Sequence, residues 1–322
     1  MAKKVILDVD TGSDDAVAIM EAVRCPALDV VGICTVWGNL DVKYTTENTL
    51  RLLDALGRKD IPVYKGVDTA MVKYLDQTRP PKQDKLSVVD ENGKELRGHY
   101  QELEGLKPTD KKPEKMDAVT FYITYLRAAT EKITLIPVGP LTNLGHALSI
   151  APDIVDKIEE IMIMGGGDSI ANISECAEAN IWHDPEAAEI VAQCGAPVLW
   201  IPLDATHSAP LGYEESAKLR ECNTFASNYA ALMIEQRTDF GRAAHGSNNT
   251  ALHDALAVAA VIDRSVLTNV LKCNVHIGLR GYGEGETIID RRCIPDEANC
   301  EFALTADKDK FLAMLCEYLG KE

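Results

Sequence analysis

The chain has 322 residues, of which 46% are hydrophobic, and a formal charge of −17. It is long enough to bury a large core, in one α/β domain or in two smaller ones, and no linker divides it. So acidic a chain is repelled by a nucleic-acid backbone and by an anionic membrane, which excludes both as partners and favours a neutral small molecule.

The nine cysteines are odd in number and scattered, and no two form a C-x-x-C pair. They indicate reduced thiols rather than a disulfide framework. The amino end runs through Lys3 and Lys4 into a strand without the apolar region of a signal peptide, and no stretch approaches the roughly 20 apolar residues of a membrane span. We therefore expect a cytoplasmic protein.

Taken in chain order, apolar runs typical of strands alternate with helical patterns. After a strand at 5–9 and a helix at 16–23, we expect strands at 30–36, 61–64, 133–137, 160–164 and 197–203, and helices at 41–56, 117–129, 141–148 and 185–193. The last third is more helical, with a strand pair at 270–277 and 287–290. This alternation predicts an α/β fold with an open, mainly parallel, doubly wound (Rossmann-like) sheet and helices on both faces.

Residues 70–116 interrupt the pattern. They are polar, rich in Lys, Asp and Pro, and carry little hydrophobic period, and His99 is their only histidine. So long a loop either has a function or is disordered, so both a lid over a site and a mobile insertion fit its composition. We expect one domain over residues 1–322 that includes this insertion.

Four aspartates crowd the first strand-to-helix turn, namely Asp8, Asp10, Asp14 and Asp15. Helix capping accounts for one or two acids, but Asp8 and Asp10 lie upstream on the strand and gain nothing from it. Like charges so close together need a cation, and oxygen ligands favour calcium or magnesium over zinc. The turn lies at the carboxyl end of a strand, where open α/β sheets bind ligands.

A second acidic position lies far along the chain, at His253-Asp254. The surrounding stretch, 251–262, is apolar on nearly every side and is typical of a buried helix. A carboxylate there is unfavourable unless it meets a cation or strong donors, so Asp254 is predicted to complete the site begun by Asp10 and Asp15. His253 is either a hydrogen-bonded core histidine or an acid that assists a leaving group.

Other strands also end in polar or glycine-rich runs, which singly are explained as turns or helix caps. Asp184-Pro185-Glu186 has the standard residues of a helix start and is interpreted as structural. Together with the acidic positions, however, these runs resemble the inosine–uridine-preferring nucleoside hydrolases, in order and over essentially the whole chain. The motifs are Asp8-x-Asp10-x-Gly12-x-Asp14-Asp15-Ala16, Gly38-Asn39, Gly139-Pro140-Leu141-Thr142-Asn143, Met164-Gly165-Gly166, Ala177-Glu178-x-Asn180-Ile181, Asp184-Pro185-Glu186-Ala187-Ala188 and His253-Asp254-Ala255.

The chain also departs from the family pattern. The family commonly has proline where Thr11 stands, and its His-Gly-x-Asp-Gly stretch after the third strand is not recognisable in the insertion. Residues that border the base are left open among His99, Tyr229, Gln236 and His245. For Trp37 and Trp182 we favour packing in the core over stacking on a base.

The resemblance implies hydrolysis of ribonucleosides to ribose and free base, with base preference open and a homodimer or homotetramer as the assembly. It further implies a calcium ion held by Asp10, Asp15, the Val138 carbonyl and Asp254, with Asp10 also acting as general base and His253 protonating the base. The implied ribose contacts are Asp14, Asn39 and Asn180 at the 2′- and 3′-hydroxyls, Asn172 and Glu178 at the 5′-hydroxyl, and Met164 along the pocket.

Two other functions are compatible with parts of the sequence. A haloacid dehalogenase-type phosphatase would use Asp8 as nucleophile with magnesium, but it needs threonine or valine where Gly12 stands and a later Gly-Asp-x-x-x-Asp, whose second aspartate is missing after Gly167-Asp168. A calcium-dependent nucleoside binder without catalysis would need the same ligands as the hydrolase. The sequence does not separate the binder from the enzyme.

Overall fold

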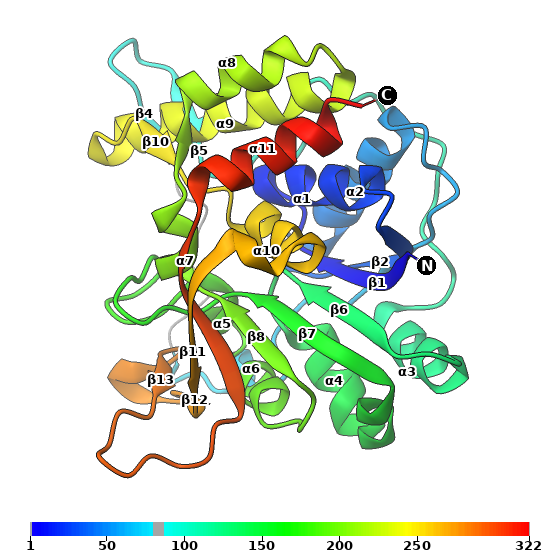
Figure 1. Ribbon diagram of the computed structural model, residues 1–322, viewed down its shortest axis with the longest axis vertical. Helices are drawn as coiled ribbons and strands as arrows, with labels where there is room; N and C mark the ends of the chain where they lie inside the picture. The colour runs from blue at the N-terminus through cyan, green and yellow to red at the C-terminus, as the bar shows by residue number, and fades with distance from the viewer. Residues whose placement is uncertain (1, 80–86, 322) are drawn as a thin grey trace.

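The computed structural model describes residues 2–79 and 87–321 (Figure 1). Its main sheet has eight strands, which are β1 (Lys3–Val9), β2 (Leu28–Thr35), β3 (Val63–Lys65), β6 (Ile133–Pro137), β7 (Ile158–Met164), β8 (Val198–Ile201), β11 (Leu267–Cys273) and β14 (Cys300–Ala306). They lie in the order β11-β14-β8-β7-β6-β1-β2-β3. Only β11 and β14 pair in antiparallel fashion, so the predicted mainly parallel sheet is confirmed.

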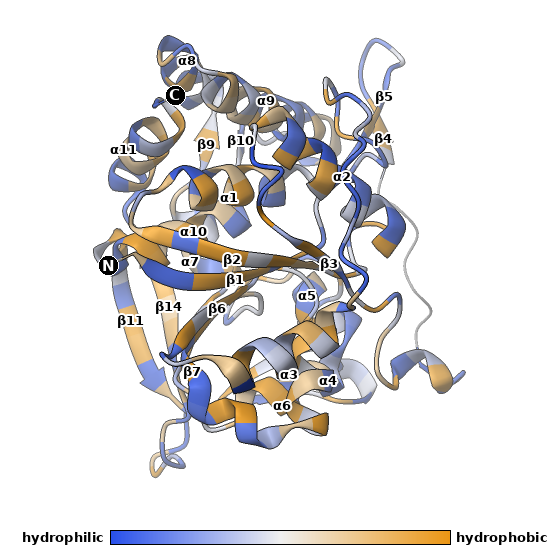
Figure 2. Ribbon diagram, turned by 90° about the vertical axis from the view of Figure 1, so that its right-hand side faces the viewer, coloured by the Kyte–Doolittle hydropathy of each residue, from blue (hydrophilic) through white to orange (hydrophobic). Residues whose placement is uncertain are grey.

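Helices cover both faces of this sheet, which Figure 2 shows close to edge-on. One face packs mainly against α1 (Ser13–Arg24), α2 (Val42–Ala55), α9 (Phe225–His245), α10 (His253–Ile262) and α11 (Lys308–Leu319). The other face packs against α3 (Ala118–Ala128), α4 (Thr142–Ile150) and α6 (Pro185–Ala192). Three more helices, α5 (Ala179–His183), α7 (Leu203–Ser208) and α8 (Tyr213–Glu221), complete the set in the described residues. The predicted double winding is thus confirmed.

The direction of winding reverses between β1 and β6. The chain first runs outward through β1, β2 and β3, and then returns to pair β6 with the opposite side of β1, in a register that sets Asp8 beside Pro137. In open α/β sheets, the crevice at the carboxyl ends of the strands at such a reversal is where ligands bind. The acidic turn after β1 therefore stands at the position that the topology favours for a site.

The predicted strand at 270–277 is wrong in detail. It divides at Asn274, whose side chain donates to the Glu297 carbonyl at 2.7 Å. Before the break, β11 joins the main sheet through β14, a strand that was not predicted. After the break, β12 (Val275–Ile277) forms the expected pair with β13 (Thr287–Ile289), and this pair is antiparallel. A polar side chain that bonds the backbone of a neighbouring loop thus splits one apolar run between two sheets.

The insertion contains short elements of its own. A 3₁₀ turn covers Lys73–Leu75, and β4 (Ser87–Val89) and β5 (Glu95–Arg97) form a hairpin. Residues 80–86 of the insertion lie outside the described residues. The remaining short pair joins β9 (Leu211–Gly212) to β10 (Asn249–Thr250). In the part of the chain that the structure describes, no helix has the length and apolar character that crossing a membrane requires.

Candidate active site

The acidic turn is held together by Asp15. Helix α1 begins at Ser13, three residues before the predicted start, and the Asp15 carboxylate accepts hydrogen bonds from the Gly12 amide at 2.8 Å and the Asp10 amide at 3.0 Å. These amides precede or begin the helix and have no helical partner, so Asp15 does cap the turn. Capping thus accounts for one acid of the turn, and the remaining buried carboxylates need another explanation.

Three carboxylates from two helices meet at this turn. Asp14 and Asp15 lie in the first turn of α1 and Asp254 in the first turn of α10, and each offers an oxygen within 4.8 Å of the others. All three side chains are buried. The structure therefore brings Asp254 to the acidic turn across more than 200 residues of sequence, although the closest trio contains Asp14 rather than Asp10.

The electrostatics of this cluster show a shortage of positive charge. Burial, and then the charge of Asp15, raise the pKa of Asp10 well above its usual range, and burial with Asp14 raises that of Asp254 in the same way. The pKa of Asp15 is raised to about 6 by burial and by Asp14. Asp14 is the exception, because burial, the largest influence, would raise its pKa, but Arg237, His253 and His99 together outweigh burial and lower the pKa. A buried all-oxygen donor set of this kind fits a hard divalent cation.

The Asp10 carboxylate is enclosed by two glycine turns. Its Oδ2 accepts a hydrogen bond from the Asn39 amide at 2.6 Å. A Cβ at Gly38 would come within 2.2 Å of Oδ2, and a Cβ at Gly139 within 2.9 Å of Oδ1. Any side chain at these positions would displace the carboxylate, which gives the Gly38-Asn39 and Gly139-Pro140 runs a role at the site beyond turn formation.

A cavity of about 110 Å³ opens above the cluster. Of the predicted site residues, nine line this cavity, and Asp10 and Asp15 lie buried close to it. The lining set is Asp14, Asn39, Val138, Met164, Asn172, Glu178, Asn180, His253 and Asp254, joined by His99, Ala179 and Arg237. The predicted positions therefore converge on one cavity, although they come from six separate segments of the chain.

One wall of the cavity is the start of α5. Asn180 Nδ2 donates to the Val138 carbonyl at 2.7 Å and to the Met164 carbonyl at 3.1 Å. Glu178 caps the helix, because its Oε2 accepts from the Asn180 amide at 3.0 Å and the Gly166 amide at 3.1 Å. Burial raises the pKa of Glu178 to about 7. These bonds fix both side chains against the ends of β6 and β7.

Two histidines reach the cavity from different segments. His253 Nδ1 shares a hydrogen bond of 2.8 Å with Thr206 Oγ1, which leaves Nε2 as the ring nitrogen for a ligand. Burial, and then Arg237, lower the pKa of His253 to about 3, so its imidazole is neutral at physiological pH. His99 comes from the insertion and packs against Gly12, where a Cβ would lie 2.4 Å from Nδ1. The insertion therefore supplies part of the cavity wall.

Arg237 is a site residue that the sequence did not reveal. Its Nη1 donates to Ser13 Oγ at 3.2 Å and to Asp14 Oδ1 at 3.1 Å. The one available signal is that Arg237 continues the stripe of α9 that buries Ala230, Met233 and Ile234. An arginine that follows such a stripe is usually a surface residue, so the signal is weak.

The other aromatic and polar candidates lie away from the cavity lining. The Tyr229 hydroxyl donates to the Glu104 carbonyl at 2.9 Å and Gln236 Nε2 to the Glu104 carboxylate at 2.6 Å, so both tie α9 to the insertion. His245 is exposed near the end of α9. Trp37 and Trp182 are buried, as the packing interpretation expected.

Asp8 does not line the cavity. Its two oxygens accept hydrogen bonds from Asn143 Nδ2 at 2.9 Å and from the Tyr122 hydroxyl at 3.1 Å, and burial raises its pKa to about 7. A carboxylate with both oxygens engaged beneath the site is unsuited to be the nucleophile of a phosphatase.

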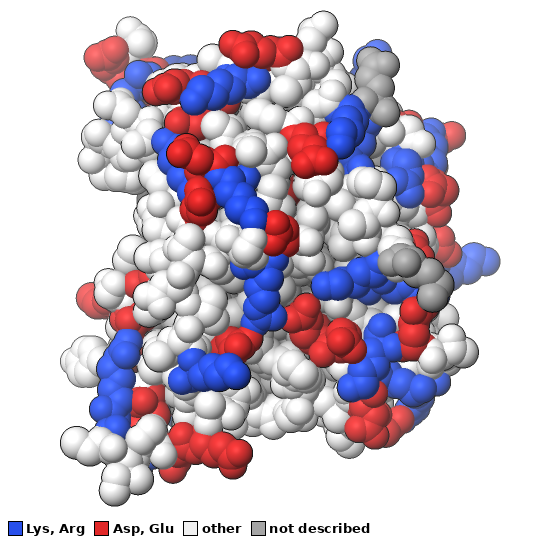
Figure 3. All heavy atoms as spheres, viewed as in Figure 1, with Lys and Arg blue, Asp and Glu red and all other residues white. Residues whose placement is uncertain are grey.

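On the face seen in Figure 3, acidic and basic side chains are interspersed rather than gathered into a basic patch.

Known proteins resemble this chain in sequence and in structure. A family model described as "Inosine-uridine preferring nucleoside hydrolase" matches residues 5–313. The pyrimidine-specific ribonucleoside hydrolase RihA of Shigella boydii is 32% identical, with 99% of each chain covered. The solved structure of a plant nucleoside hydrolase, the PpNRh1 enzyme, has a TM-score of 0.88 and 29% identity over 100% of both chains. That of a purine-preferring ribonucleoside hydrolase from Gardnerella vaginalis has a TM-score of 0.83 and 31% identity, covering 99% of this chain and 98% of the other.

Proposed function

This chain belongs to the inosine-uridine preferring nucleoside hydrolase family, and on that premise we propose that it cleaves the N-glycosidic bond of ribonucleosides with the help of a bound calcium ion. The observation that carries the proposal is the convergence of carboxylates from α1 and α10 beside one cavity at the reversal of the sheet. The family match and the engaged Asp8 carboxylate both argue against the phosphatase alternative.

Calcium would be held by Asp10, Asp15, Asp254 and the Val138 carbonyl. The support is chemical, since these are buried oxygen donors, and a cation would offset the burial and the mutual repulsion that raise the pKa values of the three carboxyl groups. When bound, a hard divalent cation lowers the pKa of a coordinated water and helps to orient substrate hydroxyls.

The carboxylates act on the sugar through their charge. Cleavage of an N-glycosidic bond builds oxocarbenium-like positive charge on the ribose, and a preorganised ring of acids stabilises that charge. Asp10 takes a proton from the attacking water, a general-base contribution typically worth about 10²–10⁴-fold. Its carboxylate is kept in place by the Asn39 amide and by the Gly38 and Gly139 turns. Attack on the face opposite the base gives inversion at C1′.

Substrate contacts follow from the lining of the cavity. Asp14, Asn39 and Asn180 bind the 2′- and 3′-hydroxyls, Asn172 and Glu178 bind the 5′-hydroxyl, and Met164 packs on the sugar. All six side chains line the same cavity. A glutamate at the 5′ position repels a 5′-phosphate, so nucleosides are cleaved and nucleotides are refused.

His253 contacts the departing base. When the Thr206 hydroxyl donates to its Nδ1, the neutral imidazole carries its proton on Nε2 and can donate it to the base. Base preference needs a test with both classes of base, because the relatives named above are pyrimidine-specific in one case and purine-preferring in the other. We retain a homodimer or homotetramer and a cytoplasmic location as parts of the proposal, the latter supported by nine free thiols.

The test measures free base and reducing sugar released from inosine, uridine and their 2′-deoxy analogues, with and without a chelator. We expect release of base from the ribonucleosides and loss of activity with the chelator. The 2′-deoxy analogues should be poor substrates, because Asp14 then lacks the 2′-hydroxyl that it would bind. Asp10→Ala should abolish turnover. Tight nucleoside binding without any turnover by the unmutated protein would instead identify a calcium-dependent binder, and equal rates on both sugars would contradict the ribose contacts.

A further inference from the structure

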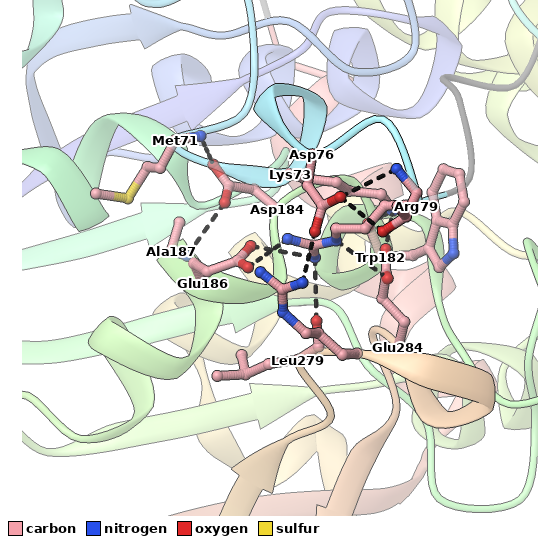
Figure 4. A network of polar contacts seen from close by, with 12 residues as sticks. Met71, Lys73, Asp76, Arg79, Trp182, Asp184, Glu186, Ala187, Leu279 and Glu284 are labelled. Atoms are coloured by element: carbon pink, nitrogen blue, oxygen red, sulfur yellow. Dashed lines mark hydrogen bonds and ion pairs between the residues drawn. The ribbon is translucent and has the colours of Figure 1, made fainter.

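A network of buried charges around Lys73 and Arg79 contacts α5 at Trp182 and does not line the cavity (Figure 4). Lys73 is fully buried, and its Nζ donates to the Trp182 carbonyl at 2.5 Å, contacts Glu284 Oε1 at 2.9 Å and lies 3.1 Å from the centre of the Trp182 ring. Arg79 bonds Glu284 at 3.1 Å and also pairs with Glu186. The network thus joins the start of the insertion to α5, α6 and the segment around Glu284.

Lys73 contacts the last turn of α5. A helix of five residues leaves its final carbonyls without helical partners, and a buried ammonium group at the Trp182 carbonyl satisfies one of them. The segment after Glu284 packs on the same helix, because a Cβ at Gly285 would come within 2.6 Å of the Trp182 Cα. A β-bridge between Ala177 and Glu286 continues this contact to the residue before Glu178.

The inner side of α5 carries the cavity residues. Glu178 caps the helix and Asn180 lies in its first turn, while Asn172 Oδ1 accepts from the Ala179 amide at 3.0 Å. A helix this short has little stability of its own, so its position depends on what holds it from outside. Among the described residues, Lys73 contacts α5 at the Trp182 carbonyl and links it to Glu284 and, through Glu284, to Arg79.

We propose that Lys73 and Glu284 are positioning residues for recognition of the substrate's 5′-hydroxyl, acting by fixing α5 so that Glu178 and Asn172 face the cavity at the right place. This inference rests on the proposed function for the identity of the substrate. Neither residue lines the cavity, so their effect passes through the helix. The insertion therefore serves the site twice, through His99 at the cavity and through Lys73 behind α5.

The test compares a ribonucleoside with its 5′-deoxy analogue. In the unmutated protein, loss of the 5′-hydroxyl leaves buried polar groups unpaired and should lower kcat/KM by about 10-fold to 100-fold. In the double variant Lys73→Met with Glu284→Gln, we expect this ratio to fall below about threefold, because the ribonucleoside loses rate while the 5′-deoxy analogue is almost unaffected. The amide oxygen that Glu284→Gln introduces can still accept from Arg79, so neither substitution leaves a buried charge alone.

Hydrogen exchange supplies a readout that does not depend on turnover. In the double variant, amides of 179–183 should exchange at least about tenfold faster, while those of β1 and β6 stay unchanged. Lys59→Met is the matched control, since Lys59 is a half-exposed lysine with two carboxylate partners, Asp54 at 3.0 Å and Asp110 at 2.6 Å. It should change neither the ratio nor the exchange.

The outcomes separate the positioning role from the proposed function. An unchanged 5′-hydroxyl ratio in a folded double variant overturns the positioning role, and so does unchanged exchange of α5. A uniform loss of rate on both substrates also overturns it, because general destabilisation does not distinguish the two. If the unmutated protein releases no base from any nucleoside, the proposed function fails, and the exchange measurement still decides whether Lys73 holds α5.

Discussion

Two groups of buried charges, one beside the cavity and one in contact with α5, are built in opposite ways. Around Asp10, Asp14, Asp15 and Asp254 the carboxylates outnumber the cations, and Arg237 supplies the basic side chain that pairs with the group. Around Lys73 and Arg79, two cations meet the carboxylates of Glu186 and Glu284. The first group is deficient in positive charge and the second is balanced.

This difference distinguishes a functional site from a structural network of ion pairs. A balanced buried network pairs its charges internally, so its value lies in fixing local geometry. An unbalanced one raises the pKa values of its carboxyl groups and is stabilised by an added cation. Burial of charge by itself therefore does not mark a functional site, whereas several uncompensated carboxylates gathered beside one cavity do. Substitutions in each group can test that distinction.

The largest effect is expected at the unbalanced cluster. Asp254→Asn should lower kcat/KM for ribonucleosides by at least about 10³-fold, because the cation loses a ligand and several kcal/mol of charge stabilisation are removed. Without calcium the same variant should melt at a higher temperature than the unmutated protein, since one repelling carboxylate is gone. Asp29→Asn, at an exposed position of β2, is the control. A loss of activity below tenfold would place the chemistry elsewhere.

A substitution in the balanced network should lower the stability of the protein, whereas Asp254→Asn should raise it in the absence of calcium. Arg79→Met removes one partner and leaves Glu186 and part of Glu284 uncompensated, which should lower the free energy of unfolding by about 3–5 kcal/mol. Arg127→Met removes a pair with Asp153 in which both side chains are more than half exposed, and should cost no more than about 1 kcal/mol. Urea unfolding measures both. Equal effects of the two variants would show that the network does not stabilise the fold.

The sequence predicted the unbalanced group and missed the balanced one. Asp10 and Asp254 stand out because an acid is out of place on a buried strand or in an apolar helix. Lys73, Arg79 and Glu284 lie in polar segments, where each has the appearance of a solvated surface charge. Their burial depends on how the insertion folds over α5, and the hydrophobic periodicity of the sequence does not predict that contact.

The fold shows the same division between local and non-local information. The parallel direction of β1, β2, β6 and β7 follows from apolar runs that alternate with helices, so it was predictable. The pairing of β14 with β11 and β8 depends on contacts between distant segments, and the division at Asn274 depends on one side chain bonding a loop. Convergence of His99 and Arg237 at the cavity is of this second kind.

Calcium itself should distinguish the two groups of charges. At a hundredfold excess over its dissociation constant, a cation that binds only the folded state adds about 2.7 kcal/mol to the free energy of unfolding. We expect calcium to raise the melting temperature of the unmutated protein and of Arg79→Met, but to leave that of Asp254→Asn unchanged. Calorimetry with calcium and with a chelator measures this. A shift of the same size in Asp254→Asn would assign the ion to another site.

The smallest effect concerns a buried acid that belongs to neither group. Glu21 of α1 is fully buried, and within the described residues neither of its oxygens has a hydrogen-bond partner. Burial raises its pKa well above the usual range. Glu21→Met removes the unpaired polar group at similar volume and should increase the free energy of unfolding by about 1–3 kcal/mol at neutral pH. Glu214→Met, at an exposed position of α8, is the matched control.

The pH dependence of the stability gain in Glu21→Met shows how much of that gain comes from the raised pKa of the buried carboxyl. Below the unfolded pKa of Glu21 the carboxyl is protonated in both states, so the acid carries no ionisation penalty there. As pH rises through the interval up to the raised folded pKa, the unfolded state ionises first and the unmutated protein loses stability. The advantage of Glu21→Met should therefore grow from acid to neutral pH in urea unfolding and then level off. An advantage independent of pH would mean that the pKa of Glu21 is the same in the folded and unfolded states, so that packing alone explains the gain.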